Sequence, residues 1–81
     1  MRLDKYLKVS RLIKRRTVAN EACDNERVTV NGKVARASYD VKVGDVIAIA
    51  FGGRTLTVEV VTVAENVGKD AAAAMYQEIN A

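Results

Sequence analysis

The spacing of the apolar residues changes at Arg27, and this change limits the chain to folds that contain both helices and strands. Before Arg27, apolar residues in the segment 2–10 recur every three or four positions, which is the period of an α-helix. After it, the segments 28–30, 45–51 and 54–63 show the period of two and the β-branched residues that are typical of β-strands. The sequence therefore predicts an α+β fold in which two short N-terminal helices pack on a small antiparallel β-sheet.

The first third of the chain is expected to hold both helices and a short connection between them. Leu12 and Ile13 interrupt a polar stretch, and we expect both to anchor this connection to the core. Thr17 is a suitable N-cap for the second helix, which we expect to run from 17 to 25. The residues of that helix expected to face inward are Val18, Ala22 and Cys23.

Residue types that tolerate positive φ mark the turns between the expected strands. Asn31-Gly32 predicts a tight turn after the first strand. Gly52-Gly53 has the length and chemistry of a two-residue hairpin loop, so 45–51 and 54–63 should pair antiparallel. Gly44 should turn the chain into the first strand of that pair.

Two segments complete the expected fold. The segment 35–43 should form an irregular edge of the sheet, and the alanine-rich segment 69–81 should form a C-terminal helix. The residues on the apolar face of that helix would be Ala72, Met75, Tyr76 and Ile79. At 81 residues the chain predicts one domain, 1–81, with a core motif over 1–63.

Composition excludes several classes of site. The chain has no histidine and one cysteine, so we expect no zinc site, disulfide or other cofactor, and we expect Cys23 to be a small buried residue. No apolar run is long enough for a membrane span, and the N-terminus lacks the apolar core of a signal peptide, which favours a cytoplasmic location. No motif of acid–base or nucleophilic catalysis is present, so we do not expect an enzyme.

Positive charge is concentrated near the N-terminus. The net charge is +3, but residues 1–36 hold ten Lys or Arg against four acids, whereas residues 37–81 hold three against six. A patch of this density predicts a polyanionic partner. We expect an RNA-binding surface formed by Arg2, Lys5, Lys8, Arg11, Lys14, Arg15 and Arg16.

The expected positions of these cations favour phosphate as the ligand. Asp4 and Lys8 should form an i,i+4 ion pair, which would leave Arg2 and Lys5 as neighbours on the solvent side of the first helix. The cations at 14–16 precede the second helix, whose N-terminal N–H groups already attract anions. This interpretation requires Arg2 and Arg16 to lie on the same side of the molecule and to be free of internal carboxylates.

Aromatic residues are few, which limits base stacking. Tyr6 and Phe51 are expected in the core, and the role of Tyr39 stays open.

Four spaced blocks, "RLDKYL", "KRRTVA", "RVTVNGK" and "VKVGDVI", resemble the alpha-L RNA-binding motif first seen in the fourth small-subunit ribosomal protein. The C-terminal "KDAAAAMYQEIN" resembles the closing helix of the bacterial RqcP (YabO) family, whose members are related to heat-shock protein fifteen. The motif's arginines match Arg2 and Arg16.

The resemblance implies a role in ribosome-associated quality control. It implies a protein, expected to be a monomer, that binds ribosomal RNA and peptidyl-tRNA on obstructed large ribosomal subunits and supports alanine tailing by a partner factor. Alternatives are a ribosome-recycling factor like heat-shock protein fifteen, an adaptor acting through its C-terminal helix, and a translational regulator that binds a folded mRNA.

Two positions depart from the motif. Arg15 replaces a common serine and adds a cation to the surface. Glu26 replaces the usual glycine before the first strand, so we expect Asn25 to adopt the positive φ of that turn.

Overall fold

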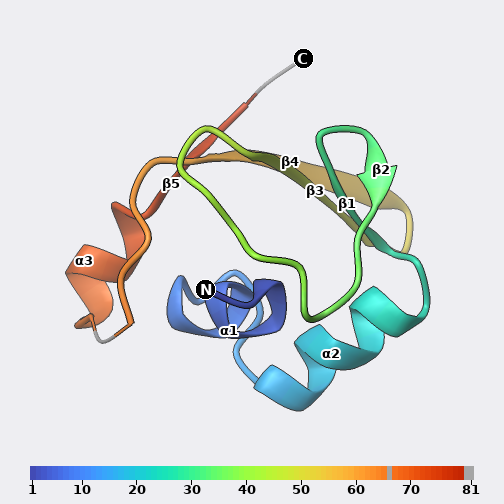
Figure 1. Ribbon diagram of the computed structural model, residues 1–81, viewed down its shortest axis with the longest axis horizontal. Coiled ribbons are helices and arrows are strands. Elements are labelled where there is room, and N and C mark those ends of the chain that lie inside the picture. The colour runs from blue at the N-terminus through green and yellow to red at the C-terminus, as the bar shows by residue number, and fades with distance from the viewer. Residues whose placement is uncertain (66, 80–81) are drawn as a thin grey trace.

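The computed structural model describes residues 1–65 and 67–79 and confirms the α+β fold class. A five-stranded antiparallel sheet has the order β2-β1-β3-β4-β5, and α1 and α2 lie beneath one face of it (Figure 1). In the described part of the chain, no helix is long and apolar enough to cross a bilayer. The elements in chain order are α1 (Leu3–Val9), α2 (Arg16–Asp24), β1 (Val28–Val30), β2 (Lys33–Val34), β3 (Val46–Phe51), β4 (Arg54–Val60), α3 (Lys69–Ala73) and β5 (Tyr76–Glu78).

The turns expected from Gly and Asn are confirmed. Asn31 and Gly32 both have positive φ, 53° and 85°, and join β1 to β2 as a two-residue hairpin. Gly52, with φ of 51°, lies in the turn that pairs Phe51 with Arg54.

The core lies between α1 and the inner face of the sheet. Leu3, Tyr6 and Leu7 of α1 are fully buried, and inward-facing residues alternate along β3 and β4. Full burial of each apolar side chain stabilises the fold by about 1.5–3 kcal/mol. The Tyr6 hydroxyl donates a hydrogen bond to the backbone oxygen of Met75 over 2.8 Å, and burial raises the pKa of Tyr6 to about 12.

The second helix begins one residue earlier than expected. Arg15 occupies the N-cap position and no side chain caps the helix, so the prediction of Thr17 as N-cap is wrong. Val18 is 46% exposed, whereas Ala19 is fully buried with Cys23, which lies four residues later on the same face. The small Ala19 lets α2 approach α1, and burial raises the pKa of Cys23 to about 11.

The turn after α2 falls on Glu26 and not on Asn25. Glu26 has φ of 60° and Asn25 has φ of −87°, which corrects the expectation for Asn25. The N–H of Arg27 donates to the carbonyl of Ala22 and the N–H of Glu26 donates to that of Cys23. These two bonds form a Schellman motif, which places Glu26 at the position that usually holds glycine.

The segment 35–43 does not form an edge of the sheet, contrary to prediction. It crosses to the N-terminus instead, where Leu3 N–H donates to the Tyr39 carbonyl over 2.8 Å and Val41 N–H donates to the Met1 carbonyl over 2.8 Å. The N-terminal ammonium of Met1 also binds Asp40 over 2.7 Å. Backbone groups near the start of α1 and in this segment satisfy one another, so it needs no strand partner.

Tyr39, whose role was open, has structural contacts on this crossing segment. Its hydroxyl donates to the buried carboxylate of Asp45 over 2.9 Å, and the Lys42 ammonium lies 5.3 Å from its ring centroid. These contacts are typical of a side chain that orders a loop.

The C-terminal helix is shorter than expected. α3 covers five residues, and the chain then forms β5, which pairs with β4, so the prediction of helix over 76–78 is wrong. The burial expected of Ala72 and Met75 is confirmed. Residues 80 and 81 of the expected helix lie outside the described residues.

Phe51 was expected in the core but is 37% exposed. It is in phase with the buried Ile47 and Ile49 but lies at the hairpin end of β3. Its position at the end of the strand leaves it without the cover that its neighbours receive.

Candidate RNA-binding surface

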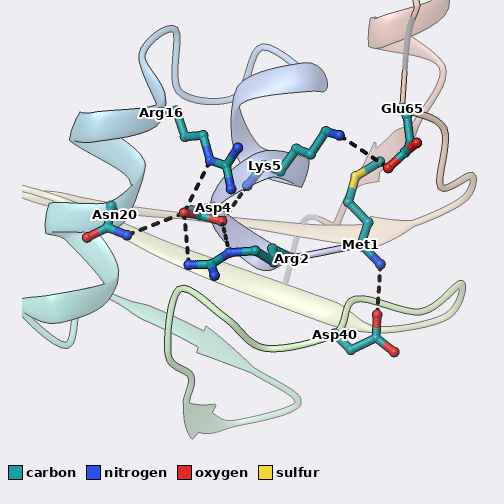
Figure 2. Close-up of polar contacts among 8 residues, drawn as sticks. All are labelled: Met1, Arg2, Asp4, Lys5, Arg16, Asn20, Asp40 and Glu65. Carbon is teal, nitrogen blue, oxygen red and sulfur yellow. Dashed lines mark hydrogen bonds and ion pairs between the residues drawn. The ribbon is translucent and has the colours of Figure 1, made fainter.

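Asp4 is the centre of a cluster that joins α1 to α2 (Figure 2). Arg2 donates from Nε to Oδ1 over 3.1 Å, and Arg16 donates from Nε to Oδ2 over 3.3 Å. Asn20 Nδ2 donates to Oδ2 over 3.3 Å, and the backbone N–H of Lys5 donates to Oδ1 over 2.8 Å. We call Arg2, Asp4, Arg16 and Asn20 the Asp4 cluster.

The expected ion pair between Asp4 and Lys8 does not form, because Asp4 points into the contact between the helices and its side chain is only 3% exposed. Burial alone raises the pKa of Asp4, but hydrogen bonds from Arg2, Asn20 and Arg16 together lower it below its ordinary value. Asp4 is therefore an ionised carboxylate at neutral pH, and it neutralises one of the two guanidinium charges beside it.

Arg2 and Arg16 meet one of the two conditions that the RNA-binding interpretation requires of them. They lie on the same side of the molecule because they bind the same carboxylate, but the expectation that they are free of internal carboxylates is wrong. Both side chains remain half exposed, at 50% and 48%. An arginine has five N–H donors in a rigid fork; Arg16 uses Nε for Asp4 and Arg2 uses Nε and one terminal nitrogen, so both keep donors for a second anion. The cluster positions the two arginines and leaves a net charge of +1.

Lys5 is also paired. Its Nζ lies 3.2 Å from Oε1 of Glu65, an ion pair between α1 and the segment that precedes α3 (Figure 2). Arg2, at the N-cap of α1, binds Asp4. Arg2 and Lys5 therefore have different ion-pair partners.

Cations at the end of α1 and in the connection to α2 line a hollow of about 670 Å³. Arg11 adopts a positive φ of 64° in the turn after α1, and it lines the hollow with Lys8 and Lys14. We call this feature the cationic hollow; its lining residues are Lys8, Val9, Arg11, Lys14, Glu65, Val67 and Lys69.

Lys69 in this hollow was not found by sequence reasoning. It lies 55 positions after Lys14, at the start of α3, and no local pattern connects the two. The segment that follows it returns to α1 and to the sheet, through the Tyr6–Met75 hydrogen bond and the pairing of β5 with β4, and residues 76–78 of this segment were mispredicted as helix.

The remaining cations lie nearer the second helix and the crossing segment. Arg15 is exposed at the uncapped N-terminus of α2. Arg36, which was also not predicted, lines a hollow together with Arg2 and Glu26. The seven predicted cations therefore divide into the Asp4 cluster, the cationic hollow, the paired Lys5 and the exposed Arg15.

Comparisons with known proteins show which family the chain resembles. Residues 1–47 match the S4 domain family. A protein of Halalkalibacterium halodurans named RQC P-site tRNA stabilizing factor is 56% identical over 77 residues, which cover 95% of this chain and 88% of that protein. The protein of the same name from Streptococcus pneumoniae is 52% identical over 80 residues, covering 99% and 91%.

A solved structure extends the similarity to the C-terminus. The heat shock protein 15 of Vibrio cholerae, described as trimeric, superposes with a TM-score of 0.90 at 29% identity, covering 98% of this chain and 81% of that one.

Proposed function

The chain belongs to the family of RQC P-site tRNA stabilizing factors, which carry the S4 RNA-binding domain, and from this premise we propose that it is a non-catalytic brace. It binds large ribosomal subunits obstructed by peptidyl-tRNA, where the tRNA meets ribosomal RNA, and supports C-terminal alanine tailing by a partner factor. The whole chain, 1–81, acts as one RNA-binding domain, as a monomer and in the cytoplasm.

The observation that carries this proposal is the position of the cations. All seven predicted RNA-binding residues come from α1 and its N-cap, the connection between the helices and the first residue of α2, within the segment that matches the S4 domain; they are Arg2, Lys5, Lys8, Arg11, Lys14, Arg15 and Arg16. Cations on this part of the fold neutralise phosphates and displace their counterions, which supplies affinity without reading sequence.

The Asp4 cluster fixes the positions of two of these cations. Because Arg2 and Arg16 share one buried carboxylate, their guanidinium groups lose little freedom when they bind a phosphate. A protein that binds tRNA and ribosomal RNA more tightly in one arrangement than in another shifts the tRNA towards that arrangement. No bond needs to be made or broken, which is why we assign no catalytic residue.

Sedimentation of tagged protein through a sucrose gradient of cell lysate tests the proposal. We expect it to comigrate with free large subunits that carry peptidyl-tRNA, and Arg16→Ala to weaken this association. Arg54→Ala, which removes an exposed arginine at the β3–β4 turn, is the matched control. Comigration with small subunits, or no ribosomal association, would overturn the proposal.

Binding to purified tRNA gives a second measurement. The logarithm of affinity should fall linearly with the logarithm of salt concentration, and Arg16→Ala should reduce the slope by about one. An affinity independent of salt contradicts the proposal.

A second candidate, ribosome recycling, is supported by the close superposition on heat shock protein 15. The two roles differ in their product. Loss of the protein should abolish alanine tails on stalled chains if it acts in tailing, whereas a recycling factor should leave the tails and delay the return of subunits to translation.

A further inference from the structure

The cationic hollow lies between the turn after α1 and the segment that leads into α3. We propose that it holds phosphates of a second RNA segment and that Lys69 is one of the phosphate ligands. This inference rests on the proposed function, and it adds a binding residue that lies outside the match to the S4 domain.

The charge around the hollow is strongly positive. Of the seven described residues that line it, four are cations and one is an acid, so these residues together carry +3, which equals the net charge of the whole chain. All four cationic side chains are exposed; they are Lys8, Arg11, Lys14 and Lys69. A concave surface lined by one sign of charge concentrates ions of the opposite sign.

Internal ion pairs do not account for these four cations. Glu65, the single acid among the described lining residues, binds Lys5, which is not one of those residues. Within residues 1–65 and 67–79, none of the four cations of the hollow forms an ion pair. Their mutual repulsion opposes folding unless water or an anion screens it, so an anionic ligand has a clear energetic role.

The fold holds Lys69 at the hollow. Ala72 and Met75, which follow it, are buried, and the Met75 carbonyl accepts hydrogen bonds from the Tyr6 hydroxyl and from the N–H of Val61, both over 2.8 Å. Lys69 therefore belongs to a segment fixed to both α1 and the sheet. The backbone that carries Lys69 is already ordered in the folded protein. Binding a phosphate therefore costs little further backbone entropy.

The lining chemistry favours a phosphate backbone over a base or an acidic peptide. Among the described lining residues, Val9 and Val67 are apolar and none is aromatic, so these residues offer no stacking surface for a base. Lys8, Arg11 and Lys14 continue the cation series that leads to Arg15 and Arg16 at α2. The hollow is thus contiguous along the chain with the surface assigned to RNA.

The hollow and the Asp4 cluster lie apart, which suits two RNA segments. Figure 2 shows Arg16 on one side of α1 and Glu65, which lines the hollow, on the other. A protein that braces one RNA against another needs two such surfaces, because a single patch occupied by one segment cannot hold the second.

Salt-dependent binding of purified tRNA and of purified large subunits, measured separately, tests the inference. The variant is Lys69→Gln, and the matched control is Lys33→Gln, because Lys33 is an exposed lysine on β2, at the other end of the molecule from α3 (Figure 1). With at least one of the two RNAs, Lys69→Gln should reduce the salt slope by about 0.7–0.9, and Lys33→Gln should leave it unchanged. Between 50 and 200 mM salt, the affinity advantage of the native protein over Lys69→Gln should shrink by about threefold.

Acylation of lysines followed by mass spectrometry gives an independent readout on the native chain. Saturating tRNA or large subunits should protect Lys69 and leave Lys33 reactive. Equal effects of the two variants with both RNAs, or protection of Lys69 by polyglutamate but not by RNA, would overturn the inference. If Arg16→Ala weakens RNA binding while Lys69→Gln does not, only this inference fails; if the native protein binds neither RNA, the proposed function fails.

Discussion

At the Asp4 cluster two guanidinium groups share one buried carboxylate, whereas at the cationic hollow four cations surround an acid already bound to Lys5. In the Asp4 cluster, the carboxylate cancels one of the two arginine charges and fixes the positions of both guanidinium groups. The hollow keeps its charge, and its cations are held by the backbone and not by partners. Under the proposed function, the two regions would be phosphate sites of different kinds, one that orients its arginines and one that attracts phosphate by charge alone.

The largest expected effect comes from the carboxylate at the centre of the cluster. Asp4→Asn removes the carboxylate charge and places an amide NH₂ group among the N–H donors that bind Asp4. We therefore expect the free energy of unfolding to fall by about 2–3 kcal/mol. The loss is smaller than for a fully buried ion pair, because both arginines are half exposed and remain hydrated. Urea denaturation measures it, and Asp70→Asn, an exposed acid of α3, is the control.

The pH dependence of stability separates the charge of Asp4 from its shape. The pKa of Asp4 is lowered in the folded protein, so its contribution is fully present above the unfolded pKa of about 3.9 and is lost as the pH falls through the folded value. The difference in stability between native protein and Asp4→Asn should therefore shrink below about pH 4. A difference independent of pH would show that Asp4 acts through packing alone.

The next effect concerns the attachment of the hollow. Tyr6→Phe removes the hydrogen bond to the Met75 carbonyl, which still accepts from two backbone N–H groups, so the expected loss of stability is about 1 kcal/mol. Hydrogen exchange should speed up in 69–78 more than in α2. Tyr76→Phe is the control, because the Tyr76 hydroxyl makes no hydrogen bond within the described residues. Equal acceleration in both segments would contradict a local role for the bond.

The sequence predicted features that depend on neighbours along the chain. The helical period of 2–10, the Asn31-Gly32 turn and the Gly52-Gly53 hairpin all follow from local geometry, and the structure confirms them. The turn at Glu26 shows the limit of this reasoning. Residue preference favoured a positive φ at Asn25, but the two hydrogen bonds that end α2 require it at Glu26.

Features that depend on tertiary contacts were mispredicted. The i,i+4 rule paired Asp4 with Lys8, but Arg16 and Asn20 on the neighbouring helix offer this carboxylate more hydrogen bonds. High alanine content favoured helix to the end of the chain. Residues 76–78 instead pair with the edge of β4 and form a strand. Lys69 is held at the hollow by long-range contacts of the residues that follow it, which include the burial of Met75 and the hydrogen bond from Tyr6, so no pattern near Lys69 could predict its place.

The smallest expected effect sharpens the difference between the two sites. Glu65 is 70% exposed, so its ion pair with Lys5 adds little to stability, but its carboxylate repels phosphates at the hollow. Glu65→Gln should therefore raise tRNA affinity by about twofold at low salt and leave the free energy of unfolding nearly unchanged. Glu59→Gln removes an exposed acid on β4, away from the lining, and should change neither quantity. A large loss of stability in Glu65→Gln would mean that the Lys5 ion pair holds the C-terminal segment in place, and the hollow would then be a by-product of that pair and not a site kept open for an anion.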